Sequence, residues 1–96
     1  MRTLAENHSL LRRKFGDRQA REIVKRLNEL QAAVNLEDIA MLPHARLHLL
    51  IGVRKDTLSV DLCHPCRLLF LCLNGSTADR RSVTEIEIVE LCLDYH

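Results

Sequence analysis

The sequence predicts an α+β fold in a single domain over residues 1–96, with an N-terminal αα-hairpin packed on a roughly four-stranded antiparallel sheet. Hydrophobic residues recur with a helical period before Pro43 and with a period of two after it. The length of 96 residues suits one domain and leaves no room for a second. Because 47% of the residues are hydrophobic and only 3% are aromatic, the core must be aliphatic.

Two helices are expected in the N-terminal part. The segment Thr3-Leu4-Ala5-Glu6 predicts a capping box at the start of the first helix, and Gly16 is a natural stop. Asp17 can cap the second helix. The apolar stripe of that helix is expected at Ala20, Ile23, Val24, Leu27, Leu30 and Val34. Its outer face is expected to carry Arg18, Arg21, Lys25 and Arg26.

Strands are expected after a further short turn that runs from Asn35 to about Pro43. The pattern predicts them at roughly 46–51, 57–62, 67–73 and 83–95. Alternation is clean in the second strand, which is typical of a half-buried antiparallel strand. In the last strand the apolar phase changes between Ile88 and Val89, which predicts a β-bulge there.

Charge is distributed unevenly although the net charge is only +1. Residues 1–35 contain eight Lys or Arg and four Asp or Glu, whereas residues 36–96 contain six and nine. A basic N-terminal half can face nucleic acid or an acidic partner, but helices also commonly carry a solvated basic face. Charge alone therefore leaves both interpretations open.

We expect a cytosolic location. No apolar run approaches the roughly 20 residues that cross a bilayer, and the first residues lack the apolar stretch of a signal peptide. The cytosol is reducing, so free thiols are the expected state of the cysteines. These are Cys63, Cys66, Cys72 and Cys92.

The spacing Cys63-His64-Pro65-Cys66 fits a redox pair or half of a zinc site. A thioredoxin-like pair lies where a strand turns into a helix, however, whereas this segment joins two expected strands. A structural zinc ion would need two further ligands, and Cys72 and Cys92 lie on apolar strands. We therefore expect neither a metal nor a cofactor, and metal analysis would test the alternative.

Several residues that suit RNA cleavage fall on or near the expected strands. They are His48, Arg54, Lys55, Arg67 and His96. In such cleavage the ribose 2′-hydroxyl attacks the adjacent phosphate, and an imidazole can act as base or acid near neutral pH. Fixed cations such as Arg67 and Lys55 would stabilise the charge on the phosphorane. Taken singly, however, a strand histidine or arginine is more commonly structural.

The order of these residues is more informative than any one of them. Arg46-Leu47-His48 is followed by Gly52, by Arg54-Lys55, and by Arg67-Leu68 with Phe70, and the chain ends in Asp94-Tyr95-His96. This order resembles the central stretch and the ending of HigB-type (plasmid maintenance killer) toxins, in the RelE/ParE superfamily of type II toxin–antitoxin systems. The resemblance covers roughly residues 10–73 and 86–96.

The resemblance implies a bacterial, cytoplasmic mRNA endoribonuclease that inhibits translation in the ribosomal decoding site and is silenced by a cognate antitoxin. His48 and His96 would share proton transfer, and Arg67 would hold the scissile phosphate. Lys55, Asp94 and Tyr95 complete the implied site, the last two by positioning substrate or imidazole. Residues implied to contact RNA or the ribosome are Arg54, Lys55, Arg18, Arg21 and Lys25, and each phosphate contact would add salt-sensitive affinity.

The chain also departs from the family pattern. Family members usually open with a β-strand, which this sequence does not predict, so a sheet edge is expected to be unpaired. Ile51 and Val53 stand where polar residues are expected, and Cys66 replaces an aromatic. A decayed or non-catalytic toxin-like protein that binds an antitoxin is therefore one alternative. A ParE-like gyrase inhibitor is another, although such relatives lack the histidine and arginine set found here.

Overall fold

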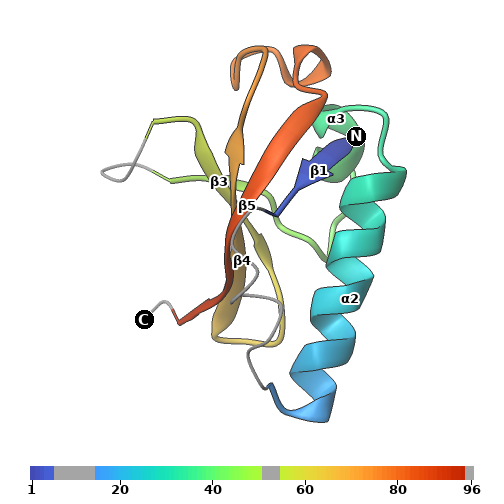
Figure 1. Cartoon of the computed structure of the whole chain (residues 1–96), viewed down its shortest axis with the longest axis vertical. Coiled ribbons are helices and arrows are strands. Elements are labelled where there is room, and N and C mark those ends of the chain that lie inside the picture. The colour runs from blue at the N-terminus through green and yellow to red at the C-terminus, as the bar shows by residue number, and fades with distance from the viewer. Residues whose placement is uncertain (6–14, 51–54, 95–96) are drawn as a thin grey trace.

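The computed structural model describes residues 1–5, 15–50 and 55–94, with the backbone alone for 92–94, and it has the α+β architecture that the sequence predicts (Figure 1). The helices are α2 (Asp17–Ala32), α3 (Leu36–Ala40) and the 3-10 helix η1 (Arg80–Ser82). The strands are β1 (Arg2–Leu4), β2 (His48–Leu49), β3 (Thr57–Asp61), β4 (Cys66–Cys72) and β5 (Glu85–Asp94). In Figure 1, α2 lies along one side of the twisted sheet.

The sheet is mixed rather than purely antiparallel, with the strand order β1-β5-β4-β3-β2. β1 runs parallel to β5, and the other neighbouring pairs are antiparallel. The expectation that the first strand is missing is therefore wrong, and so is a helix start at Thr3, which lies opposite Ile86. β1 covers the edge of β5, where the N–H of Arg2 donates to the carbonyl of Thr84 at 2.8 Å. The remainder of the expected first helix, residues 6–14, lies outside the described residues.

Helix α2 packs on the sheet through a face that differs partly from the predicted stripe. Ile23 and Leu30 are buried as expected, but Val24 and Val34 are 56% and 72% exposed. Arg26, expected on the outer face, is only 3% exposed. Two carboxylates of the same helix and a main-chain oxygen of β3 satisfy its guanidinium group, so a charged side chain can occupy this buried position.

The hydrophobic core fills the space between α2 and one face of the sheet. Its strand residues include Leu58, Val60, Leu68, Phe70, Ile86, Ile88 and Leu91. In β3 the core residues alternate with Thr57, Ser59 and Asp61, as the sequence predicts, because successive strand residues point to opposite faces. The polar positions of β3 therefore lie on the face away from α2. Thr57 and Ser59 are buried too, however, so the expectation of a half-buried strand is wrong.

A β-bulge in β5 keeps apolar side chains on the core face along the strand. Phe70 lies opposite Ile88, but the residue before Phe70 lies opposite Glu90, so Val89 is an extra residue in β5. Ile88 and Leu91 are consequently both core residues although they are three positions apart. The bulge predicted from the change of apolar phase is therefore confirmed.

Strand β2 is shorter than the sequence predicts and contains only His48 and Leu49. Arg46 has a φ of 47°, in the left-handed region, so extended backbone begins only after it. Leu49 is 53% exposed.

Helix α3 is the short turn expected after Asn35. The Asn35 side chain caps it by accepting a hydrogen bond from the N–H of Glu37 at 3.0 Å. Leu36 and Ile39 of this helix are buried in the core. Neither α3 nor any other helix in the described part of the chain has the length and apolar character needed to cross a membrane.

Candidate functional site

Arg46, Asp61 and Arg67 lie in one row across the sheet at the end of β3. Asp61 and Arg67 are register partners in β3 and β4, and Arg46 precedes β2 on the other side of β3. The Nε atom of Arg46 lies 3.6 Å from Oδ2 of Asp61, and the Nε atom of Arg67 lies 3.4 Å from Oδ1. Two guanidinium groups thus share the carboxylate of Asp61.

The backbone of Asp61 is fixed from two sides. Its N–H donates to the carbonyl of Ala45 at 2.6 Å, and its carbonyl accepts from Nε of Arg26 at 2.8 Å. Arg46, the residue after Ala45, keeps its left-handed φ at a cost of about 1–2 kcal/mol for a residue with a Cβ. Strain of this kind is found at functional sites, and here it accompanies the placement of Arg46 beside Asp61.

A pocket of about 240 Å³ opens beside this row, at the turn between β3 and β4. Its lining is Arg46, Asp61, Leu62, His64, Pro65, Cys66 and Arg67. The side chains of Arg46 and Arg67 are 65% and 29% exposed, so a ligand can reach both. His64 is exposed and precedes Pro65 through a cis peptide bond. Two guanidinium groups and an imidazole in one pocket are suited to holding a phosphate group.

His48 lies on the same face, one step along the strands from this row. It is the register partner of Ser59, which precedes Asp61 by two residues and therefore shares its face, roughly 7 Å away. Among the described residues, three buried polar atoms here have no hydrogen-bond partner: His48 Nε2, Ser59 Oγ and Asp61 Oδ1. The contact of Asp61 Oδ1 with Arg67 is an ion pair without hydrogen-bond geometry. Buried polar atoms usually have a hydrogen-bond partner, so a ligand or water can supply the partner that these three atoms lack.

The end of β5 lies beside the row. The backbone of Asp94 is opposite Cys66, the residue before Arg67, so the described chain brings Asp94 near the predicted phosphate-binding residue. Tyr95 and His96, which the resemblance assigns to the same site, lie outside the described residues.

Lys55 does not join the row. It is exposed and precedes β3, whereas Asp61 ends that strand. The strand between Thr57 and Asp61 spans roughly 13 Å. The structure therefore separates Lys55 from Arg67, which the motif match placed in one site. Arg54 lies outside the described residues.

Arg46 and Asp61 are site residues that the sequence reasoning missed. A signal was present for both, because Arg46 precedes His48 by two residues and Asp61 follows Ser59 by two. Only the strand register shows that these positions align with Arg67 in one row.

The cations predicted on the outer face of α2 are exposed, apart from Arg26. They are Arg18, Arg21 and Lys25. Gln19 ties this end of α2 to the turn between β3 and β4, since its amide donates to the Cys63 carbonyl at 3.1 Å and accepts from the Cys63 N–H at 2.9 Å. In Figure 1 the start of α2, in blue, and that turn both lie at the bottom of the view.

The cysteines differ in state. Cys66 is part of a disulfide, whereas Cys63 and Cys72 are free thiols. The expectation of free thiols is wrong for Cys66, because spacing in the sequence does not show which cysteines approach in space. Burial, and after it the charge of Asp56, raises the pKa of Cys72 to about 11, so this thiol stays protonated at neutral pH. Across the described ranges, no group of three or more His, Cys, Asp or Glu side chains could hold a metal ion.

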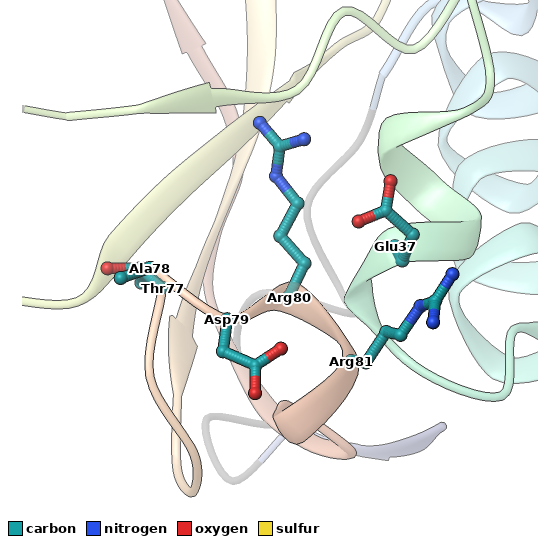
Figure 2. Close-up of a pocket in the computed structure, with 6 residues that line it drawn as sticks. All are labelled: Glu37, Thr77, Ala78, Asp79, Arg80 and Arg81. Atoms are coloured by element: carbon teal, nitrogen blue, oxygen red, sulfur yellow. The ribbon is translucent and has the colours of Figure 1, made fainter.

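A larger pocket of about 530 Å³ lies near the other end of β4, where η1 meets α3 (Figure 2). Its lining is Glu37, Thr77, Ala78, Asp79, Arg80 and Arg81. Figure 2 shows Arg80 and Arg81 extending from η1 in different directions, with Glu37 projecting from α3. Two carboxylates thus accompany the two guanidinium groups of this pocket, whereas Arg46 and Arg67 share the one carboxylate of Asp61.

Comparison of the chain with protein-family models, curated protein sequences and solved structures finds no match. The resemblance to HigB-type toxins therefore rests on the motif residues of the sequence. The row of charged residues rests on the structure alone.

Proposed function

We propose that this chain is the toxin of a type II toxin–antitoxin system and that it cuts mRNA on the ribosome. The row of Arg46, Asp61 and Arg67, with His48 on the same sheet face, supports this best. Arg67 and His48 are the residues to which the resemblance assigns phosphate binding and proton transfer. The row adds a second guanidinium group beside Arg67.

In the proposed reaction, the ribose 2′-hydroxyl attacks the neighbouring phosphorus. His48 accepts the hydroxyl proton as the general base. Arg46 and Arg67 balance the negative charge on the phosphorane, an effect worth about 3 kcal/mol for one preorganised donor. The bond to the 5′-oxygen then breaks, and that oxygen takes a proton from His96, which by the resemblance shares proton transfer with His48. The products carry a 2′,3′-cyclic phosphate and a 5′-hydroxyl.

The exposed cations of α2 supply the proposed contact with ribosomal RNA. Arg18, Arg21 and Lys25 are solvent-exposed on one helix. Each phosphate that they neutralise releases counterions, so the affinity for the ribosome falls as the salt concentration rises. In the cell, a cognate antitoxin would hold the toxin silent until it is removed.

Cleavage of mRNA in a purified translation system, with and without ribosomes, tests the proposal. Wild-type protein is expected to make ribosome-dependent cuts. Arg67→Ala is expected to lose at least about 100-fold in rate, because it removes a donor to the phosphorane, and a chain lacking His96 is expected to lose its cuts as well. Arg81→Ala, which removes the same charge from the second pocket, is the control and should cut normally.

No cuts from folded wild-type protein would overturn the nuclease proposal. A gyrase supercoiling assay on the same preparation would then separate the two alternatives. Inhibition would favour a ParE-like toxin, and no inhibition would favour a non-catalytic partner of an antitoxin.

A further inference from the structure

The ion pairs of Asp61 with its two arginines are longer than hydrogen bonds. Charge-assisted N–H···O bonds are about 2.7–2.9 Å long, whereas Nε of Arg46 and Nε of Arg67 lie 3.6 Å and 3.4 Å from the carboxylate. Oδ1 of Asp61 accepts no hydrogen bond in the described residues although it is buried. Asp61 thus keeps both guanidinium groups near one point without the short hydrogen bonds of a closed ion pair.

A phosphate group is better suited to this point than a carboxylate is. It offers more acceptor oxygens, and a guanidinium group binds it with two parallel N–H···O bonds. The pocket of about 240 Å³ opens at the same place. Because Ala45 and Arg26 fix the backbone of Asp61, only its side chain needs to turn away when an anion enters.

We propose that Arg46 and Arg67 form a clamp for one phosphate group, and that the Asp61 carboxylate occupies the clamp when no phosphate is bound. The inference rests on the proposed function for the source of that phosphate, which is an RNA backbone. Arg46 thereby becomes a second substrate-binding residue. Asp61 becomes an internal competitor that keeps the two arginines in place and lowers their affinity for any anion.

Titration of the folded chain with inorganic phosphate, followed by the NMR signals of the arginine Nε–H groups, tests the clamp directly. Asp61→Asn removes the competing charge and is expected to tighten phosphate binding about tenfold. Arg46→Gln removes one half of the clamp and is expected to weaken it about tenfold. Arg81→Gln is the matched control, since it removes an exposed arginine from the other pocket and should leave the affinity unchanged.

An unchanged or weaker phosphate affinity in folded Asp61→Asn overturns the competitor role, and an unchanged affinity in Arg46→Gln overturns the clamp. Arg46 is exposed, so Arg46→Gln decides the matter if Asp61→Asn does not fold. A short oligoribonucleotide titrated in parallel should rank the variants in the same order if the phosphate comes from RNA.

The titration uses no ribosomes, and its outcome is therefore separate from the cleavage assay. Phosphate binding that follows the expected order, without any mRNA cuts, would contradict the nuclease and leave the clamp standing. Cuts in mRNA, with a phosphate affinity that neither variant changes, would contradict the clamp alone.

Discussion

His48 and Ser59 are register partners in strands β2 and β3, and His48 Nε2 and Ser59 Oγ are both buried without a hydrogen-bond partner among the described residues. Ser59 is 0% exposed. Burying an unpaired hydroxyl costs free energy, so this pair opposes folding at the point where the candidate site begins. A cost of this kind is expected where polar groups are kept for a ligand rather than for the fold.

Ser59→Ala is therefore expected to stabilise the free protein by about 1 kcal/mol, because it removes a buried polar atom that has no partner. The same substitution at Ser82 should have the opposite sign. Ser82 Oγ accepts from the N–H of Ser76 at 2.9 Å and donates to the carbonyl of Asp79 at 2.6 Å. Urea unfolding of both variants measures the difference, and a destabilised Ser59→Ala would show that the hydroxyl has a partner in solution.

Arg26→Met is expected to lower the free energy of unfolding by about 2–3 kcal/mol, since it leaves partners of a buried charge unpaired. The guanidinium group of Arg26 contacts Glu22 and Glu29 at 2.7 Å each and donates to the carbonyl of Asp61 at 2.8 Å. Arg21→Met, an exposed position on the same helix, should change stability by less than about 0.5 kcal/mol. Equal effects of the two substitutions would contradict the buried position of Arg26.

Gly75→Ala is expected to destabilise the chain by about 2–4 kcal/mol, through a left-handed backbone and a steric overlap. Gly75 has a φ of 67°, and a Cβ placed there would overlap the carbonyl group of Ser82. A Cβ at Gly16 would meet nothing within 4 Å. Gly16→Ala is thus the matched control, expected to cost less than about 1 kcal/mol at this helix N-cap. Thermal unfolding compares the two, and a neutral Gly75→Ala would contradict the described turn.

Glu29 is expected to stabilise the fold through its ionised form. Burial by itself raises the pKa of this carboxyl, but hydrogen bonds from His44 and Arg26, with their charges, outweigh it and hold the pKa below 4.5. A carboxyl whose pKa is lower in the folded chain contributes stability above its unfolded pKa, and that contribution is lost as the pH falls through the folded value.

Glu29→Gln should accordingly be less stable than wild type at neutral pH, and the difference should shrink as the pH is lowered. Chemical unfolding at several values between about pH 3 and pH 7, a range that brackets carboxyl titration, measures this. A difference that stays constant over the range would show that the charge of Glu29 contributes nothing.

The sequence predicts parts of this fold well because local patterns carry them. The clean alternation of β3 and the phase change at Val89 each specify which side chains face the core, and both are found. β1 was missed because its three residues have little pattern of their own and are ordered by pairing with the edge of β5. The burial of Arg26 was missed because it depends on a carbonyl group 35 residues away.

The candidate site was predictable only in part for the same reason. Arg67 and His48 could be chosen by residue type and by resemblance, without knowledge of distances. Strand register places Asp61 beside Arg67, and the left-handed backbone of Arg46 accompanies its place beside Asp61. A local sequence pattern predicts neither the register nor the left-handed backbone. Lys55 was chosen from the motif, but it precedes β3, whereas Asp61 ends that strand beside Arg67.

The chemistry of the cut ends tests the central claim most directly. Messenger RNA cleaved on ribosomes by wild-type protein would be analysed for its end groups, beside an mRNA with a single 2′-deoxyribose at the cleavage position. Attack by the 2′-hydroxyl at the row of Arg46, Asp61 and Arg67 predicts a 2′,3′-cyclic phosphate and a 5′-hydroxyl, and no cut at the deoxyribose. A 3′-hydroxyl with a 5′-phosphate, or a cut that persists at the deoxyribose, would contradict it.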